Sequence, residues 1–268
     1  MHAAKRLAEV RRTAPLVHCM TNIVAANLQA NGLLALGASP VMADGMEEAG
    51  EIAALASCTV LNIGTPDARK IEAMIAAGKS ARAAGHPLIL DPVGAGATRF
   101  RKQSAERLLR ELDVSLVRGN AGEIAAIAGI DWKAKGVDAG SGNADIAAAA
   151  RSVAKKYCCL VAVSGEEDIV TDGTHTIRVS GGHPAMTGVS GTGCLLSAVC
   201  AAFLAACTET PLETVASALA FYKKAGESAA AAAEGPGDFP IQLLNSLNRL
   251  DGTSTEYRQF TMEEEAIS

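Results

Sequence analysis

Apolar and polar positions along the chain change period repeatedly, and this predicts strands and helices in turn. Short continuous apolar runs predict buried strands at 16–18, 40–42, 60–63, 87–90, 114–117 and 160–163. Longer runs with helical spacing predict helices at about 2–12, 47–56 and 98–112. Two more helices have a recognisable start: one is capped by Thr21 or Asn22 and runs to Leu36, and one begins at Thr65-Pro66 and ends at Gly85. Continuous apolar strands separated by helices are typical of a mostly parallel sheet with helices on both faces, so we expect an α/β fold.

The rest of the chain adds a hairpin and further helices to this pattern. Residues 169–170 and 176–179 flank the turn Asp172-Gly173, which predicts the hairpin. The stretch 136–143 predicts a loop, and we expect the acidic end Glu263-Glu264-Glu265 to be frayed. No repeat or shift in composition marks a boundary, so we expect one domain over residues 1–268.

The composition excludes several classes of protein. Apolar residues make up 49% of the 268 residues but aromatic ones only 3%, which predicts an aliphatic core and closely packed helices. The net charge of −5 and the lack of a basic patch argue against nucleic-acid binding. No apolar run is long enough for a membrane span, and no signal peptide is recognisable. The 7 cysteines form no C-x-x-C pair, which favours a reduced, cytoplasmic protein.

The strongest chemical signal is the run Gly191-Thr192-Gly193-Cys194 at the start of an apolar helix. A glycine-rich turn at a helix start leaves backbone N–H groups unpaired, and the helix dipole makes such a turn an anion site. Cys194 lies in the first turn of that helix, where a thiol ionises more easily. The run therefore indicates phosphoryl transfer, although a small apolar cysteine filling the core is the alternative.

Polar residues that follow predicted strands are further candidates. Ligands of open parallel sheets bind beyond the carboxyl ends of the strands, where Asp91 could order magnesium on phosphates or merely end its strand. Asn120 and Glu123 could form a helix capping box, which local grounds alone favour narrowly, but a second carboxylate at a strand end, Asp91, favours a magnesium role. The Arg118 guanidinium could donate a bidentate pair of hydrogen bonds to a phosphate. Ser164 could place its hydroxyl on a nucleotide phosphate or simply turn the chain.

Three of these motifs together resemble the hydroxyethylthiazole kinases, thiamine-salvage enzymes of the ribokinase-like superfamily. The motifs are Asp91-Pro92-Val93-Gly94-Ala95, Asn120-x-x-Glu123 and Gly191-Thr192-Gly193-Cys194. The resemblance runs from about Pro15 to Leu250 and includes Thr21-Asn22, residues 31–43 and Gly235-Pro236-Gly237.

The resemblance implies transfer of a phosphoryl group from ATP, with Mg²⁺, to the hydroxyl of 4-methyl-5-(2-hydroxyethyl)thiazole. It implies that Asn120 and Glu123 match the superfamily's magnesium-organising motif, and with the strand-end position of Asp91 we expect Asp91 and Glu123 to hold the metal. It also implies a homotrimer with active sites between subunits. The expected contacts are Arg118, Ser164, Asn120, Thr192 and Gly193 for ATP, Met42, Gly191 and Asn22 for the thiazole, and Cys194 as the catalytic residue.

The sequence departs from the family pattern at three places. Cys19-Met20 and Asp44-Gly45-Met46 lie near the expected thiazole site, and Ser164 stands where threonine is usual. A related kinase for a hydroxymethylpyrimidine, or a hydratase-type relative, would be expected to have aspartate at position 194. A noncatalytic nucleotide sensor would be favoured by loss of Asp91 or Glu123, and both are present.

Overall fold

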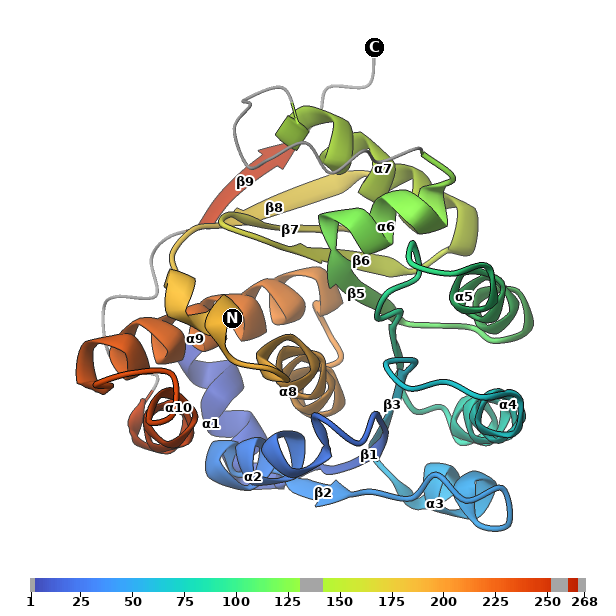
Figure 1. The fold of residues 1–268 in the computed structure, drawn as a ribbon, viewed down its shortest axis with the longest axis horizontal. Helices are drawn as coiled ribbons and strands as arrows, with labels where there is room; N and C mark the ends of the chain where they lie inside the picture. The colour runs from blue at the N-terminus through green and yellow to red at the C-terminus, as the bar shows by residue number, and fades with distance from the viewer. Residues whose placement is uncertain (1–2, 131–141, 252–259, 265–268) are drawn as a thin grey trace.

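One continuous sheet runs through the computed structural model, which describes residues 3–130, 142–251 and 260–264. Nine strands of this part of the chain lie in the order β2-β1-β3-β4-β5-β6-β7-β8-β9 (Figure 1). The strands from β2 to β6 in that order are parallel, and β6 to β9 pair antiparallel. The bounds are β1 Leu16–Met20, β2 Ser39–Val41, β3 Cys58–Asn62, β4 Leu88–Asp91, β5 Leu116–Asn120, β6 Leu160–Ser164, β7 Asp168–Thr171, β8 His175–Val179 and β9 Phe260–Glu264.

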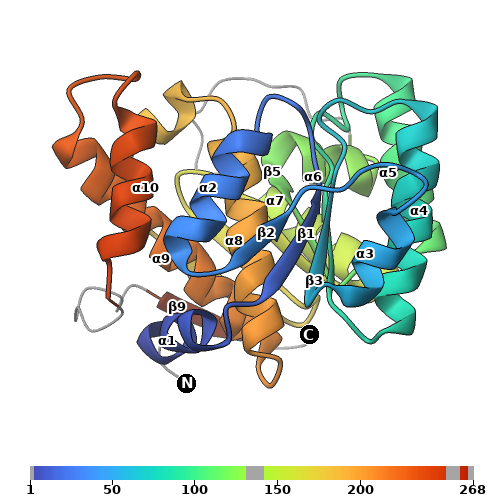
Figure 2. The same ribbon diagram turned by 90° about the horizontal axis from the view of Figure 1, so that it is seen from below.

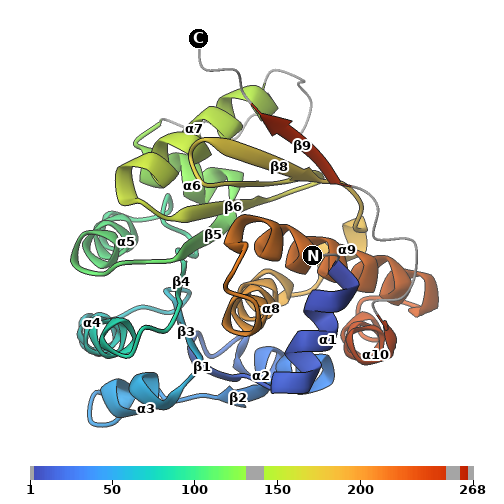
Figure 3. The same ribbon diagram turned by 180° about the vertical axis from the view of Figure 1, so that it is seen from behind.

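Helices cover both faces of the sheet, as the views from the front and from behind show (Figures 1 and 3). One face carries α3 Ala49–Leu55, α4 Ala68–Ala83, α5 Arg99–Glu111, α6 Ala121–Ala128 and α7 Gly142–Tyr157. The other carries α1 Ala3–Thr13, α2 Ala26–Leu36, α8 Thr192–Ala206, α9 Pro211–Ala232 and α10 Phe239–Arg249. A short 3₁₀ helix, Pro184–Gly188, precedes α8. The expected α/β class is confirmed.

Helix α8 lies at the centre of its layer because nearly all of its surface is apolar. It packs on the sheet and contacts α1, α2 and α9 (Figure 2). Small residues allow these close approaches: a Cβ added to Gly32 of α2 would lie 2.3 Å from Leu195 Cδ1 of α8. The packing of aliphatic side chains against small ones agrees with the low aromatic content.

The predicted elements are all present, but several boundaries differ. The helix expected to start at Thr65-Pro66 begins at Ala68, because the Asp67 carboxylate accepts the Lys70 N–H at 2.8 Å and caps it there. Helix α2 begins at Ala26 rather than directly after Thr21 or Asn22. The Asn22 side chain instead caps a turn, accepting the N–H groups of Val24 and Ala25.

The expectation of a frayed acidic end was wrong for Glu263 and Glu264. These residues belong to β9, which pairs antiparallel with β8 and supplies backbone partners that the local charge pattern does not reveal. Of the expected loop 136–143, residues 136–141 lie outside the described part of the chain, and residues 142–143 begin α7. Among the helices that the structure describes, none combines the length and apolar character that a membrane crossing requires.

The parallel strands bring the candidate residues together at one edge of the sheet. Asn62 ends β3 beside Asp91, which ends β4, and Asn120 ends β5 beside Ser164, which ends β6. Because parallel strands all point the same way, residues from distant parts of the sequence meet at this carboxyl edge.

Candidate active site

The start of α8 forms a tight turn at the carboxyl edge of the sheet. Gly191 is its N-cap in the left-handed region, with φ 91°. A Cβ there would be strained by the backbone and would also meet Ala25 Cβ at 3.3 Å, so the turn requires glycine. The N–H groups of the next residues begin a helix and have no intrahelical partner, as expected for an anion site.

Three successive carbonyl groups of this turn are held by side chains from three other elements. Tyr222 of α9 donates to the Thr192 carbonyl at 2.7 Å. Arg118 of β5 donates to the Gly193 carbonyl at 3.0 Å, and Gln29 of α2 donates to the Cys194 carbonyl at 2.7 Å. The turn is therefore fixed between the sheet and two helices. Sequence reasoning missed Gln29 and Tyr222, although a lone glutamine within an otherwise apolar helix face was a signal for the first.

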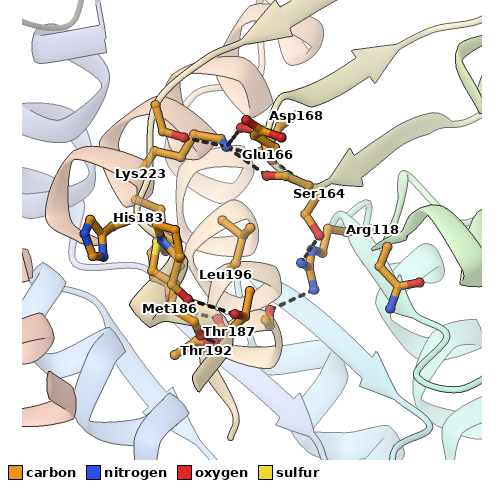
Figure 4. A pocket seen from close by; sticks show the side chains of 17 residues that line it. Arg118, Ser164, Glu166, Asp168, His183, Met186, Thr187, Thr192, Leu196 and Lys223 are labelled. Carbon is orange, nitrogen blue, oxygen red and sulfur yellow. Dashed lines mark hydrogen bonds and ion pairs between the residues drawn. The ribbon is translucent and has the colours of Figure 1, made fainter. Parts of the chain in front are cut away.

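A cavity of about 460 Å³ opens beside the turn, between the ends of β5 and β6 and the start of α8 (Figure 4). Arg118 is 7% exposed and contacts both sides of it, donating to Ser164 Oγ as well as to the Gly193 carbonyl. Asn120, Thr192 and Gly193 also line this cavity. The structure thus brings together all five residues expected to contact ATP.

A buried ion pair fixes the far wall of the cavity. Lys223 Nζ donates to the carbonyls of Gly165, Glu166 and Gly181 and lies 3.2 Å from Asp168 Oδ1 (Figure 4). Burial raises the pKa of Asp168, and the Lys223 charge opposes that rise. The pair joins the β6–β7 turn to the segment after β8, and sequence reasoning found neither partner because they lie far apart in the chain.

Asp91 is a buried carboxylate, and only one of its two oxygens accepts hydrogen bonds. Its Oδ2 accepts Asn62 Nδ2 at 2.6 Å and Ser197 Oγ at 2.9 Å, whereas Oδ1 is buried without a hydrogen-bond partner. Burial raises the pKa of Asp91 to about 6, although the Arg118 charge lowers it. An enclosed, unpaired carboxylate oxygen is the kind of group that a water molecule or an ion satisfies.

Asn120 and Glu123 form the capping box at the start of α6. Asn120 Oδ1 accepts the Glu123 N–H at 2.9 Å, and Glu123 Oε2 accepts the Asn120 N–H at 2.8 Å. Glu123 Oε1 also accepts the Gly94 N–H at 2.8 Å, so this carboxylate joins the loops after β4 and β5. The capping role is real, and each oxygen keeps a lone pair for another partner.

Cys194 is half-buried, and the expected easier ionisation of its thiol was wrong. Burial and the nearby Asp91 carboxylate raise the pKa of Cys194, and the amides of Asn22 and Asn62 only partly oppose this. Asn22 Nδ2 lies 3.3 Å from Cys194 Sγ. Helix position alone suggested a thiolate, whereas desolvation and a neighbouring negative charge favour the thiol.

Met42 follows β2 and is 38% exposed. It does not line the cavity beside Arg118, but the carboxyl ends of β1 and β2 are neighbours, so its loop lies next to the loop that carries Asn22. His18 of β1 ties this loop down through a ring nitrogen 2.5 Å from the Ala43 carbonyl oxygen.

The donors at this edge fit magnesium. In the ranges 3–130, 142–251 and 260–264, no group of three or more His, Cys, Asp and Glu could hold a metal by itself. Magnesium at a phosphate site takes one or two carboxylates and completes its shell with water and phosphate oxygens. The unpaired Oδ1 of Asp91 and the carboxylate of Glu123 match that requirement.

Comparison with solved structures shows the class of fold. A ribokinase-like superfamily protein from Enterococcus faecalis aligns with a TM-score of 0.60 and 14% identity, covering 91% of this chain and 88% of that one. The fold is therefore ribokinase-like, with the candidate site at the carboxyl edge of its parallel sheet.

Closer relatives identify the family within this class. The model of the hydroxyethylthiazole kinase family matches residues 7–253. A hydroxyethylthiazole kinase from Exiguobacterium is 52% identical over 242 residues, 90% of this chain and 92% of that one. The hydroxyethylthiazole kinase structure from Pyrococcus horikoshii aligns with a TM-score of 0.88 and 38% identity over 98% of this chain and 99% of that chain. The chain belongs to the hydroxyethylthiazole kinase family and is a kinase.

Replacing Asp91 with asparagine should stabilise the metal-free protein at neutral pH. Folded Asp91 has a pKa of about 6 against an ordinary value of 3.8, so the folded state holds the proton more tightly. The contribution of Asp91 to the free energy of unfolding therefore falls as the pH rises from about 4 to about 6. We expect Asp91→Asn to raise the free energy of unfolding by about 1–3 kcal/mol above that range, with the gain vanishing near pH 4.

Denaturant unfolding in buffer with a chelator measures this difference. Asp67→Asn is the matched control, because asparagine caps a helix as well as aspartate does and Asp67 is exposed. A variant at Asp91 that is less stable than the parent at neutral pH would contradict the assignment of burial as the dominant effect.

Proposed function

We propose that the protein transfers a phosphoryl group from ATP to the hydroxyl of 4-methyl-5-(2-hydroxyethyl)thiazole, in thiamine salvage. The observation that carries this proposal is the position of Arg118. Its guanidinium donates to Ser164 Oγ on one side and to the Gly193 carbonyl on the other. One cation thus lies between a cavity of nucleotide size and the turn that leads to Cys194.

On the nucleotide side, five residues would contact ATP: Arg118, Asn120, Ser164, Thr192 and Gly193. The cavity of about 460 Å³ that they line holds the base and sugar, while the start of α8 receives the phosphates. The Arg118 guanidinium can donate further N–H groups to a phosphate and neutralise its charge. It can do so while it keeps its hydrogen bonds to Ser164 and Gly193.

On the acceptor side, Cys194, Gly191, Asn22 and Met42 would surround the thiazole alcohol. Cys194 takes the proton of the attacking hydroxyl. The raised pKa of the Cys194 thiol leaves only a small fraction as the thiolate that can accept this proton. The loose transition state of phosphoryl transfer tolerates this, because little proton transfer has to precede the reaction.

Asp91 and Glu123 would hold Mg²⁺, which supplies positive charge to the transferring phosphate. We also propose that residues 1–268 form one kinase domain that acts in the cytoplasm. Each of the seven cysteines, all within the described ranges, is a free thiol, which is in keeping with a reducing compartment.

We further propose a homotrimer whose acceptor sites are shared between subunits. Four of the nine exposed large apolar side chains of the described residues follow β1 and β2 on the acceptor side: Ile23, Val24, Met42 and Met46. Ile23 and Val24 are 83% and 62% exposed directly after Asn22. Exposed apolar side chains next to a site favour its completion by another chain.

Light scattering tests the trimer, which should have three times the chain mass of 27.4 kDa. Ile23→Asp should give monomers with reduced turnover, because a carboxylate would be buried in the interface. Leu55→Asp on α3, 75% exposed and away from Asn22, is the control that keeps the trimer. A parent chain that is monomeric and fully active at nanomolar concentration would rule the trimer out.

The function itself is tested by following phosphorylation with ATP, Mg²⁺ and the thiazole alcohol, with a hydroxymethylpyrimidine as competing acceptor. We expect turnover of the thiazole alcohol, a fall of about 10²–10⁴-fold in Cys194→Ala, and retained or higher turnover in Cys194→Asp. Cys158→Ala changes an exposed thiol and should leave turnover unchanged.

Three results would count against this account. Faster turnover of the hydroxymethylpyrimidine than of the thiazole alcohol would show that the pyrimidine is the substrate. ATP binding without turnover of either alcohol would indicate a nucleotide sensor. Full activity of Cys194→Ala would remove the proposed base.

A further inference from the structure

Two buried asparagine side chains connect Asp91 to Cys194. Asn62, at the end of β3, donates its Nδ2 to Asp91 Oδ2 at 2.6 Å. Its Oδ1 accepts Asn22 Nδ2 at 2.9 Å, and the same Asn22 nitrogen lies 3.3 Å from Cys194 Sγ. Asn62 is completely buried and Asn22 is 5% exposed, so water does not compete for these bonds.

The two amides can be oriented in only one way. The Asp91 carboxylate accepts hydrogen bonds, so the nitrogen of Asn62 must face it and the oxygen of Asn62 must face Asn22. At the other end, Asn22 Oδ1 accepts the N–H groups of Val24 and Ala25, which leaves the nitrogen of Asn22 to face Asn62 and the thiol. The donor toward Cys194 is therefore fixed by the carboxylate at one end and by the backbone at the other.

The surrounding backbone is shaped to admit these side chains. A Cβ added to Gly64 would lie 2.6 Å from Asn22 Nδ2, so only glycine leaves room for that amide. The Gly64 N–H also donates to Asn62 Oδ1 at 2.9 Å, and Arg101 holds the Gly64 carbonyl at 2.8 Å. The segment after β3 is thereby held against the amides.

We propose that Asn62 is a positioning residue for phosphoryl transfer, which holds the Asp91 carboxylate and, through Asn22, the Cys194 thiol in one hydrogen-bonded line. This proposal rests on the proposed function. Asp91 lies on β4 and Cys194 on α8, and the amide line fixes the second relative to the first. Ser197, one helical turn after Cys194, adds a direct bond from α8 to Asp91 Oδ2 at 2.9 Å.

Steady-state kinetics of Asn62→Ala provide the first measurement. We expect kcat to fall by about 10–100-fold, the size of one hydrogen bond to a charged group, with KM for ATP unchanged because Asn62 does not line the nucleotide cavity. Thr59→Val is the matched control on β3: Thr59 is equally buried, and its hydroxyl has no hydrogen-bond partner. It should keep the parental kcat.

The second measurement is independent of any substrate. Iodoacetamide alkylation of Cys194 is followed by mass spectrometry, with exposed Cys158 as the internal reference, in the parent, Asn62→Ala, Asn22→Ala and the double variant. Asn22→Ala removes the donor to Cys194, and Asn62→Ala removes the acceptor that holds this donor in place, so each single variant should slow alkylation by up to about tenfold. Because Asn62 also holds Asn22, the two effects should be less than additive: the double variant should be slowed by less than the product of the two single factors.

The outcomes separate this proposal from the proposed function. Parental kcat in Asn62→Ala, unchanged alkylation, or additive effects in the double variant would overturn the role of Asn62. If Asn62→Ala does not fold, Asn62→Leu keeps a side chain of similar volume without a donor or an acceptor, and the same results are expected of it. A parent without turnover of the thiazole alcohol would overturn the proposed function, whereas the alkylation series would still decide the role of Asn62.

Discussion

The candidate site depends on how the first turn of α8 is held. Successive carbonyls of Thr192, Gly193 and Cys194 accept hydrogen bonds from Tyr222, Arg118 and Gln29, which come from α9, β5 and α2. A helix start is useful for binding an anion only if its N–H groups point in a constant direction. Side chains bound to the carbonyls provide that constancy and leave the N–H side of the turn to a ligand.

The parallel sheet supplies the remaining groups because four neighbouring strands, β3 to β6, each end on a polar residue at its carboxyl edge. Asp91 illustrates the cost of this arrangement, since burial raises its pKa to about 6 and leaves one oxygen without a partner. Proteins tolerate such a group where function requires it. The Lys223–Asp168 pair places a second buried charge beside the cavity, where three carbonyls and a carboxylate surround the ammonium group.

The sequence predicted the elements and the strand-end candidates because both depend on local patterns. Apolar runs identified the strands, and the direction shared by parallel strands placed Asp91, Asn120 and Ser164 at one edge. Contacts between distant segments could not be read in this way: Gln29 meets Cys194 across 165 residues, and β9 pairs with β8 despite its acidic composition. The thiol of Cys194 was also misjudged, because its helix position is visible in the sequence and its burial beside Asp91 is not.

Turnover of Gly193→Ala tests the central claim most directly. A Cβ at Gly193 would lie 3.1 Å from Arg118 Nη1, so the guanidinium would have to shift by a few tenths of an ångström, which weakens its hydrogen bond to the turn. Alanine favours the helix more than glycine does, so the free energy of unfolding should change by less than about 1 kcal/mol. The account predicts that kcat falls about tenfold or more, as for loss of a charged hydrogen bond. Parental turnover in a folded Gly193→Ala protein would contradict it.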